Sequence, residues 1–332
     1  MRKTMCVLRS ALTVLLVALV TPGCSGADPS TAPTGPGLTE VRLAYLPGPV
    51  SLPFEVAVRN GIFERNGLRV VPTEGLDLTV FTTAVSQGRY EIAMTVPTMA
   101  LAAAEKGLDV QIVAGLQRSS QARPNLAWVT KDPAIGSVEQ LRGRTVAVPA
   151  LVGQVTDSFK FLLQQRGVDP KEVRFVAVQS GGIDQLQAGR VDAVVHGMVL
   201  GRHTVTELGL TAHEDVVAQA VQEASGGTVR EALTLAFASR AEYTRDHPEV
   251  VRAFRRSLDE AVDHVESHDA EARALLQERF KVSPEVAAAA VFPTWKVAVE
   301  PDEVAPYVTI SRAVGSITGT PDIDRLVWQD RP

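Results

Sequence analysis

Short apolar runs alternate along the chain with helix-like segments that end in glycine, and this alternation limits the fold. Strands made almost wholly of apolar residues are typical of parallel sheets that helices cover on both faces. Glycine takes the positive φ that ends a helix, so it marks the end of each strand–helix unit. The sequence therefore predicts an α/β fold in which each sheet is mostly parallel and flanked by helices.

The pattern gives approximate positions for the elements. The expected strands are 41–46, 68–74, 90–95, 109–116, 145–150, 173–178, 191–197, 216–221 and 233–239. The expected helices are 51–66, 78–87, 98–107, 138–141, 155–166, 184–188, 202–208, 242–264, 270–280, 284–291 and 302–317.

One phrase occurs twice, as SQGRYEIAMTVPTM (86–99) and QAGRVDAVVHGMVL (187–200). In both copies a Gly-Arg pair ends a helix, and an acid, Glu91 or Asp192, stands where the next strand begins. Ligands of parallel sheets bind at the opposite, carboxyl end of the strands. We therefore interpret the acids and arginines of the phrase as structural or solvent-facing, and expect the two loops that follow the strands to face one cleft.

The repeated order of elements predicts two lobes, because about 290 residues exceed what one compact core usually takes. A strand that returns after the second lobe predicts two crossings and a hinge. We expect a signal peptide at 1–23, a lipidated cysteine and flexible tether at 24–39, the first part of lobe 1 at 40–130, lobe 2 at 131–232, and a return to lobe 1 with C-terminal helices at 233–332.

The first residues have the pattern of an export signal. A basic start precedes the apolar run ALTVLLVALV (11–20), which is too short to span a bilayer comfortably. Cys6 and Cys24 are the only cysteines, so the exported part has no internal disulfide. The Pro/Ser/Thr/Gly-rich segment after Cys24 favours acylation there and a tether. Thr21 and Pro22 depart from the usual acylation motif, and ordinary cleavage nearby is the alternative.

Charge excludes two classes of partner. The formal net charge is −5, and removal of the three basic leader residues, Arg2, Lys3 and Arg9, takes it to −8. An acidic chain without a basic run is not expected to bind nucleic acid or to dock on a membrane by electrostatics.

Several phrases, in their order and spacing along 41–330, resemble the substrate-binding proteins of ABC importers for nitrate, sulfonates, taurine and thiamine-pyrimidine precursors. These are RNGIFERNGLRVV (59–71), AVSQGRYEIAM (84–94), EKGLDVQIVAGL (105–116), SVEQLRGRTVAVP (137–149), LQAGRVDAVV (186–195) and RDHPEVVRAFRRSLDEAV (245–262).

The resemblance implies a two-lobed periplasmic-binding-protein type 2 fold with the ligand cleft at the hinge. It implies a monomeric, lipid-anchored receptor on the extracytoplasmic face of the cell membrane, which delivers a sulfonate, a pyrimidine or vitamin precursor, or an aromatic acid to a permease. No catalytic residue, cofactor or metal is expected. Two alternatives stay open: an enzyme on the same fold, and a ligand-sensing lipoprotein without a transport role.

The candidate ligand site lies beyond the carboxyl ends of the strands, where helix N-termini offer free N–H groups. The candidate residues are Tyr45, Ser51, Phe54, Gly75, Leu76, Thr95, Pro97, Thr98, Arg118, Gln154, Thr156, Ser180, His196 and Met198.

Some of these candidates have alternative interpretations. Thr98 and Thr156 are candidate hydroxyl donors, and plain helix capping is the alternative for both. Arg118 could pair with a carboxylate or sulfonate, and a solvated loop charge is its alternative. His196 is, in this order, a ligand contact, a polar wall residue or a general base. The segment around His196 lacks the proline that the related proteins lead us to expect there.

Overall fold

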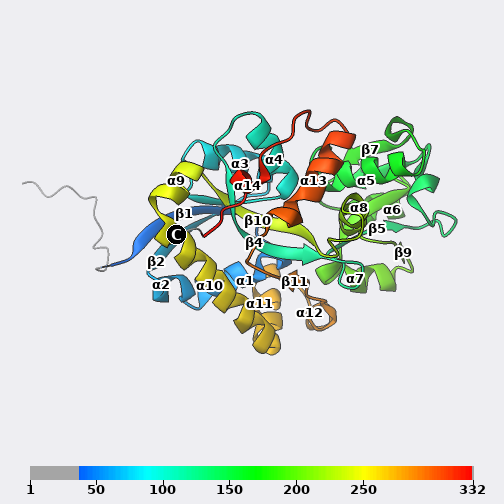
Figure 1. The fold of residues 1–332 in the computed structure, drawn as a ribbon. Helices are drawn as coiled ribbons and strands as arrows, with labels where there is room; N and C mark the ends of the chain where they lie inside the picture. The colour runs from blue at the N-terminus through cyan, green and yellow to red at the C-terminus, as the bar shows by residue number, and fades with distance from the viewer. Residues whose placement is uncertain (1–36, 331–332) are drawn as a thin grey trace, which may run out of the picture. The chain divides into compact units, whose positions relative to one another are not determined.

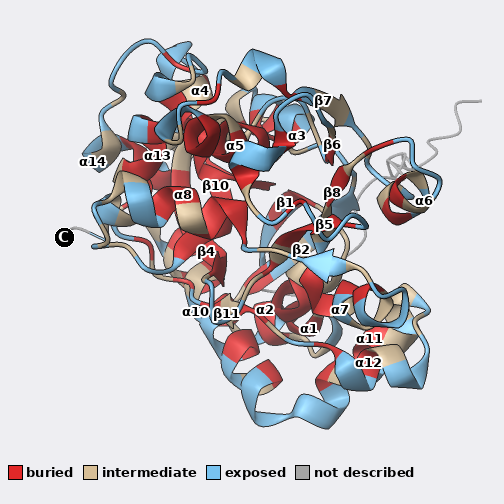
Figure 2. Cartoon of the chain, turned by 90° about the vertical axis from the view of Figure 1, so that its right-hand side faces the viewer, coloured by how far each residue is buried: buried red, intermediate tan, exposed pale blue. Residues whose placement is uncertain are grey.

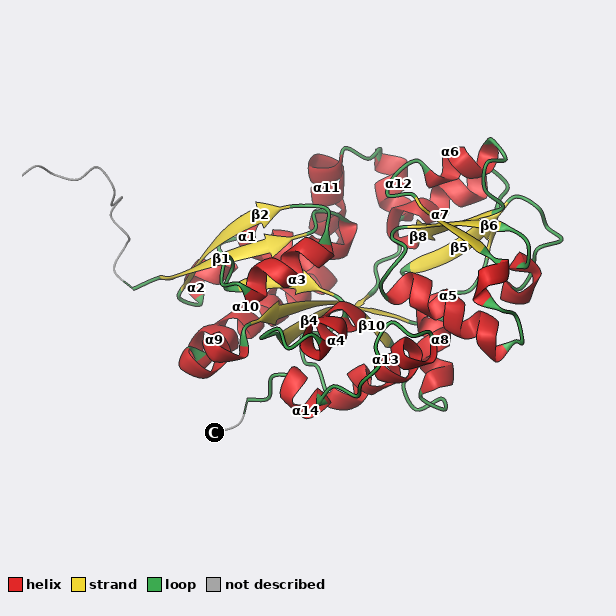
Figure 3. Ribbon diagram, turned by 90° about the horizontal axis from the view of Figure 1, so that it is seen from above, coloured by secondary structure: helices red, strands yellow, loops and turns green. Residues whose placement is uncertain are grey.

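The computed structural model describes residues 37–330. The predicted signal peptide, Cys24 and most of the predicted tether lie outside the described residues. The described chain forms two sheets with helices on their faces, as Figures 1 and 3 show, which confirms the predicted α/β class. Within residues 37–330, no helix combines the length and the hydrophobicity that a membrane crossing requires.

The first sheet has the strand order β11-β4-β10-β3-β1-β2. Its strands are β1 (Thr39–Tyr45), β2 (Leu68–Glu74), β3 (Ile92–Thr95), β4 (Gln111–Ser119), β10 (Ala232–Ser239) and β11 (Thr294–Trp295). β1 pairs in parallel with β2 and β3, whereas β10 runs antiparallel between β3 and β4. The strand that returns late in the sequence therefore lies in the middle of the first sheet.

The second sheet has the order β7-β6-β8-β5-β9. Its strands are β5 (Leu126–Thr130), β6 (Thr145–Val148), β7 (Arg174–Ala177), β8 (Ala193–Gly197) and β9 (Thr211–Ala212). β6 pairs in parallel with β7 and β8, and β5 is antiparallel to β8 and β9. Each sheet thus combines a parallel group of three strands with antiparallel neighbours.

Helices connect the strands and cover both sheets. They are α1 (Leu52–Arg59), α2 (Ile62–Arg65), α3 (Leu78–Ser86), α4 (Pro97–Glu105), α5 (Gln154–Gln165), α6 (Gly182–Gln187), α7 (Met198–Glu207), α8 (Val216–Ala224), α9 (Ala241–Asp246), α10 (Pro248–Ser267), α11 (Asp269–Phe280), α12 (Pro284–Ala289), α13 (Pro301–Ala313) and α14 (Ile323–Leu326). Short 3₁₀ turns occur at η1 (Pro49–Ser51), η2 (Val138–Leu141) and η3 (Pro170–Glu172).

Three hydrophobic cores hold these elements together. The shared core joins the two sheets: it runs from α3 and α4 on the first sheet through α13 to α5 and α8 on the second. The first-sheet core lies under α1, α2, α10 and α11, and the second-sheet core lies under α6 and α7. Buried residues follow the strands and the inner helix faces in Figure 2, as an α/β packing requires.

The repeated phrase performs the same structural task in both sheets. Glu91, before β3, accepts a hydrogen bond from the backbone N–H of Arg42 at 2.6 Å. Asp192, before β8, accepts one from the N–H of Thr145 at 2.8 Å. Each carboxylate also pairs with an arginine, Arg42 or Arg144. The structural interpretation of the two acids is therefore confirmed.

Several element predictions need correction. Residues 216–221 form helix α8 and not a strand, because the buried Asp215 carboxylate caps the N–H groups of Val217 and Ala218. The helix expected over 51–66 is broken by Gly61, whose φ is 64°. The helix expected over 242–264 is interrupted at His247, before Pro248. β4 continues through Ser119, so the loop expected at 117–119 is strand.

Candidate functional site

The main candidate site is a cavity of about 580 Å³ lined by residues of both sheets, here called the cleft cavity. The first sheet contributes ends of β4 and β10, and η1 lies beside them. The second sheet contributes the carboxyl end of β8 and the starts of α5 and α7. The segment between α11 and α12 closes one side. The cavity therefore lies between the two lobes and beyond the carboxyl end of β8, as the sequence predicts. The segment after β3, which was expected to face the same cleft, does not line it.

Thr234 organises the polar side of the cleft cavity. Its hydroxyl accepts a hydrogen bond from Asn125 Nδ2 at 2.8 Å and lies 3.2 Å from both Gln117 O and Gln117 Oε1. Its backbone carbonyl accepts a hydrogen bond from Gln154 Nε2 at 2.8 Å. One threonine of β10 thus holds one end of three side-chain amides, which come from β4, the segment before β5 and the start of α5.

The other end of each amide has no hydrogen-bond partner within the described chain. The unpaired atoms are Gln117 Nε2, Asn125 Oδ1 and Gln154 Oε1. The three residues are only 3%, 3% and 8% exposed. A buried polar atom left unpaired costs about 1–3 kcal/mol, and these three belong to residues that line one cavity, so a solute or a water molecule there can pair with them.

The remaining walls of the cleft cavity are mostly apolar, with Thr204 and Ser283 as polar exceptions. Val50 contributes from η1, Leu126 from β5, Val199 and Leu200 from α7, and Val282 from the segment after α11. None of the described residues that line the cavity is an aspartate, glutamate, lysine or arginine. The cavity can therefore hold a molecule with one polar edge and an apolar body.

His196 is the residue before the end of β8, and it is the one histidine among the described residues that line the cleft cavity. Burial lowers the pKa of its imidazole below 6.5, so the ring is uncharged at neutral pH. The ring lies over Gly201 of α7, where an added Cβ would come within 2.3 Å of His196 Nε2. Glycine at position 201 therefore makes the space that the imidazole occupies.

Of the predicted site residues, Gln154 and His196 line the cleft cavity, and Thr98 lines a smaller cavity of about 260 Å³. Thr98 Oγ1 is buried and has no partner in the described chain. Gly153 also lines the smaller cavity, and a Cβ there would lie 3.3 Å from Met99 Cε. The start of α4, the helix after β3, thus approaches the loop that follows β6 here.

Other predicted residues are buried in β1, η1 and α1. Phe54 is fully buried and packs against Tyr45, with ring centroids 4.6 Å apart. The Tyr45 hydroxyl lies 3.0 Å from Glu55 Oε1 and 3.3 Å from Arg279 Nη2, and burial raises its pKa. The Ser51 hydroxyl donates to Gly48 O at 2.8 Å. These side chains serve the packing of α1 and β1.

Four more predicted residues serve the fold through hydrogen bonds, a helix start or core packing, and they do not line the cleft cavity: Thr95, Pro97, Thr156 and Met198. Thr95 is buried, with its hydroxyl 3.0 Å from that of Thr82, and Pro97 begins α4. Thr156 donates to Ala150 O at 2.6 Å, which orders the loop before α5. Met198 is 3% exposed and belongs to the second-sheet core.

Three predicted residues do not line the cleft cavity: Gly75, Leu76 and Ser180. Leu76 is 71% exposed, and Ser180 is exposed too. Gly75 packs closely on Phe81, because an added Cβ would come within 2.6 Å of that ring.

Arg118 lies in a strand and is buried, so it is not the solvated loop charge that was the alternative interpretation. It lies within β4 with 1% of its side chain accessible, and its guanidinium pairs with Glu303 at 2.8 Å. It also donates to the carbonyl oxygens of Lys296 and Ala298, at 2.8 and 2.7 Å. Burial alone would raise the pKa of Glu303, but Arg118 reverses this and lowers it. The guanidinium of Arg118 is therefore held within the fold by Glu303 and two carbonyl oxygens.

Asn125 and Thr234 were not predicted as site residues. Both carry a weak signal: Asn125 is a polar residue directly before an apolar strand, and Thr234 is a lone polar residue within the run ALTLAFA. Buried polar residues in such strands need partners. The pattern could thus have marked each of them as a residue with a specific contact, but it does not show that the two residues share one site.

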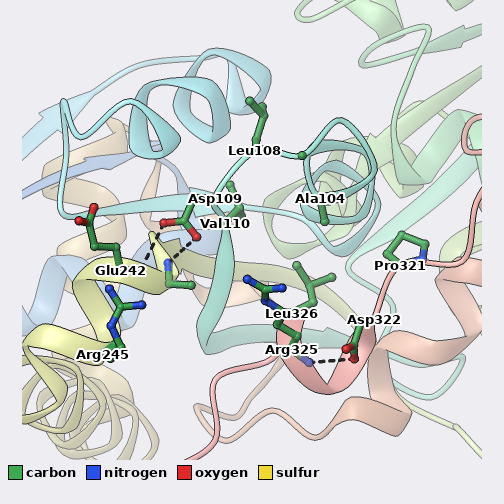
Figure 4. A pocket seen from close by; sticks show the side chains of 12 residues that line it. Ala104, Leu108, Asp109, Val110, Glu242, Arg245, Pro321, Asp322, Arg325 and Leu326 are labelled. Carbon is green, nitrogen blue, oxygen red and sulfur yellow. Dashed lines mark hydrogen bonds between the residues drawn. The ribbon is translucent and has the colours of Figure 1, made fainter.

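Another cavity, of about 510 Å³, lies near the amino end of β4 (Figure 4). Its Asp109 already accepts hydrogen bonds from the N–H groups of Ala241 and Glu242, at 3.1 and 3.2 Å, and so caps α9. This edge is opposite the one where parallel sheets bind ligands. Within residues 37–330, no group of three His, Cys, Asp or Glu side chains is placed to hold a metal ion.

The chain is similar to known binding proteins. A family model described as NMT1/THI5 like matches residues 49–272. The periplasmic aliphatic sulphonate binding protein SsuA from Escherichia coli is similar in structure, with a TM-score of 0.71 and 16% identity over 88% of this chain and 98% of that one. No curated protein matches the sequence.

Two further structures agree with this one. The alkanesulfonate-binding protein SsuA from Xanthomonas axonopodis pv. citri, bound to MOPS, has a TM-score of 0.69 and 14% identity over 89% of this chain and 99% of that one. The ligand-binding component of an ABC-type import system from Staphylococcus aureus, with zinc bound, has a TM-score of 0.67 and 13% identity over 87% and 96%. At these identities the likeness shows the fold, and it confirms the predicted two-lobed architecture.

Proposed function

This chain belongs to the NMT1/THI5-like family, and we propose that it is the solute-binding protein of an ABC import system. The observation that carries the proposal is the cleft cavity with its three unpaired buried amide atoms. A cavity between two lobes with unpaired polar atoms is suited to a reversible ligand, because closure of the lobes buries the solute.

Capture of the solute depends on contacts from both lobes. α7 of the second sheet contacts η1 and α12, which pack with the first sheet. A backbone hydrogen bond from Val291 N to Val199 O, at 3.2 Å, also crosses here. In our proposal these contacts form when the lobes close around the solute and break when it is released to a permease.

The proposal includes export and a lipid anchor. The apolar run 11–20 and the cysteine at position 24 support a signal peptide followed by acylation. The Pro/Ser/Thr/Gly-rich stretch after Cys24 would then hold a monomeric receptor at the extracytoplasmic face of the cell membrane. Replacement of Cys24 by alanine should release the protein into the soluble fraction. Membrane retention equal to that of the unchanged chain would contradict acylation at Cys24.

A thermal-stability screen tests the binding function. A solute at about 100 times its dissociation constant should stabilise the protein by roughly 2.7 kcal/mol and raise its melting temperature. The panel should include sulfonates, nitrate, pyrimidines, aromatic acids and carboxamides. Mass spectrometry of each stabilising solute after incubation separates binding from catalysis. Conversion of that solute would favour an enzyme on the same fold, and the absence of stabilisation by any solute would contradict the receptor function.

A further inference from the structure

The orientation of the three amides in the cleft cavity follows from their fixed ends. Gln154 Nε2 donates to a carbonyl, Thr234 O, so the end that is left free must be its oxygen. Asn125 Nδ2 donates to Arg118 O at 3.0 Å, so its free end is also an oxygen. The Thr234 hydroxyl can donate to Gln117 O instead and accept from the Gln117 side chain, so this contact allows either amide end to be free, and we take the end that the structure leaves unpaired, Nε2. The site therefore offers two acceptors and one donor.

Two free acceptors discriminate against an anion. A sulfonate or carboxylate only accepts hydrogen bonds, so it would leave Asn125 Oδ1 and Gln154 Oε1 unpaired and repel them. The first turns of α5 and α7 line the cavity, and the amino end of a helix carries a partial positive charge. Met198 N of α7 is already bonded to Asn125 O, at 2.8 Å. The partial positive charge at the starts of α5 and α7 suits a carbonyl oxygen, but it is not the full charge that would balance an anion.

No full charge is available in the cavity to balance a charged solute. Gln117 and Arg118 are neighbours in β4, so their side chains leave the strand in opposite directions. The guanidinium of Arg118 is bonded to Glu303 and two carbonyl oxygens away from the cavity. No carboxylate lines the cavity among the described residues either, so a cationic solute would lack a partner. Burying an unpaired charge is unfavourable for both signs.

We propose, on the basis of the function assigned above, that the solute is an uncharged molecule with a primary carboxamide or urea group on an apolar body. A primary carboxamide carries two N–H donors and one carbonyl acceptor, which complements two acceptors and one donor. The donors pair with Asn125 and Gln154, and the carbonyl accepts from Gln117. The apolar body lies against Leu126, Leu200 and the other apolar walls.

Matched probes that differ only in their polar group test the proposal. Benzamide, benzoate and benzenesulfonate share one ring, and hexanamide, hexanoate and hexanesulfonate share one chain. Calorimetric titration and melting temperatures are measured with each. We expect the amide of each set to bind at least tenfold more tightly than its two anions. An anion that binds as tightly as its amide would overturn the inference and leave the solute-binding function intact.

Two variants connect the preference to the site. Gln117→Met and Gln154→Met remove one donor and one acceptor with little change in side-chain size, and each should weaken amide binding about tenfold or more. Gln165→Met, on the exposed side of α5, is the matched control and should bind as the unchanged protein does.

Circular dichroism confirms that each variant is folded. An amide preference that survives in a folded Gln117→Met or Gln154→Met variant would overturn the inference. So would the absence of binding by either amide. If the wider anion panel also failed to bind, the proposed function itself would be contradicted.

Discussion

The Arg118–Glu303 pair is a buried charge pair whose removal should be costly. The Arg118 side chain is 1% exposed, and its guanidinium donates hydrogen bonds to Glu303, Lys296 O and Ala298 O. Arg118→Met leaves a largely buried carboxylate and two carbonyl oxygens without this donor. We expect the free energy of unfolding to fall by about 3–5 kcal/mol, measured by urea denaturation.

A surface pair provides the control for this prediction. Arg59 and Glu278 lie 2.7 Å apart, with side chains 48% and 64% exposed. Arg59→Met should change the free energy of unfolding by no more than about 1 kcal/mol. The double variant Arg118→Met with Glu303→Met should recover part of the loss, because no charge is then left alone. Equal effects of the two single variants would contradict the buried role of Arg118.

His196 should make stability depend on pH. Burial lowers the pKa of its folded imidazole below that of the unfolded chain, which is about 6.5. The unfolded chain therefore binds more protons than the folded one below about pH 6.5, and stability falls as pH drops through 6.5 toward the folded pKa. Above about pH 6.5 the contribution is fully present.

His196→Gln should remove this component of the pH dependence. Urea denaturation at several pH values between about 5 and 8 measures it. His213 is also buried enough that its pKa is lowered, so part of the dependence should persist in the variant. The prediction fails if the variant loses as much stability on acidification as the unchanged protein.

At the residue scale, the sequence could place a site residue only where local order decides its position. His196 lies near the end of β8 and Gln154 begins α5, the helix after β6, so the rule that ligands bind at the carboxyl ends of strands placed both at the candidate site. Arg118 has its partner 185 residues away, and nothing local announces that contact. Thr234 joins amides that come from three separate elements, and its role depends on where β10 enters the sheet.

Among the secondary-structure elements, Asp215 determines the start of α8. Its two oxygens accept from Val217 N and Ala218 N at 2.9 and 3.1 Å, from Ser119 Oγ at 2.5 Å and from Leu126 N at 3.1 Å. The carboxylate thus joins α8 to both ends of the segment that crosses between the sheets. Burial raises its pKa, and the four donors oppose that rise.

Asp215→Ala should destabilise the protein more than the loss of an ordinary helix cap. It removes a cap and leaves buried donors unpaired, for a combined loss of about 3 kcal/mol in the free energy of unfolding. Asp77→Ala is the matched control, because Asp77 caps α3 through Thr79 N and Val80 N but is exposed. We expect about 1 kcal/mol there. Similar losses for both variants in urea denaturation would show that the hinge contacts of Asp215 contribute little.

The element predictions succeeded where patterns are local and failed where tertiary contacts decide. The strands of the repeated phrase were predicted because glycine and apolar residues define their ends. The apolar run 216–221 fits a buried strand as well as a buried helix, and only the cap at Asp215 and the packing on α5 select the helix. Short β9 and β11 have no pattern of their own, since two residues carry no period.

For the molecule as a whole, the cores indicate where the lobes can and cannot separate. The shared core crosses from α3 and α4 to α5 and α8 beside the smaller cavity of about 260 Å³, and α13 contacts both sides. The Ser316 hydroxyl donates to Asp157 of α5 at 2.8 Å, and Thr318 N to Glu105 of α4 at 2.6 Å. The cleft cavity lies on the other side, between the first-sheet and second-sheet cores. Opening of the lobes should therefore pivot about α13.

Distance measurements between spin labels can test this pivot. Both natural cysteines, Cys6 and Cys24, lie in the leader and can be replaced by serine, so introduced cysteines are labelled uniquely. Glu207 on α7 and Ala274 on α11 are exposed and report on the side of the cleft. A stabilising solute should shorten the mean distance between these two labels by more than about 2 Å or narrow the distribution of that distance, because the solute favours the closed lobes.

A second pair of labels serves as the control on the pivot side. Gln164 on α5 and Arg312 on α13 are exposed and are joined through the shared core. Their distance should not change when the solute is added, since a close-packed core does not deform continuously. Equal changes in both pairs would mean that the lobes move apart as whole bodies and that α13 is no pivot. A change in neither pair, at a solute concentration that raises the melting temperature, would mean that the cavity is preformed and binds without hinge closure.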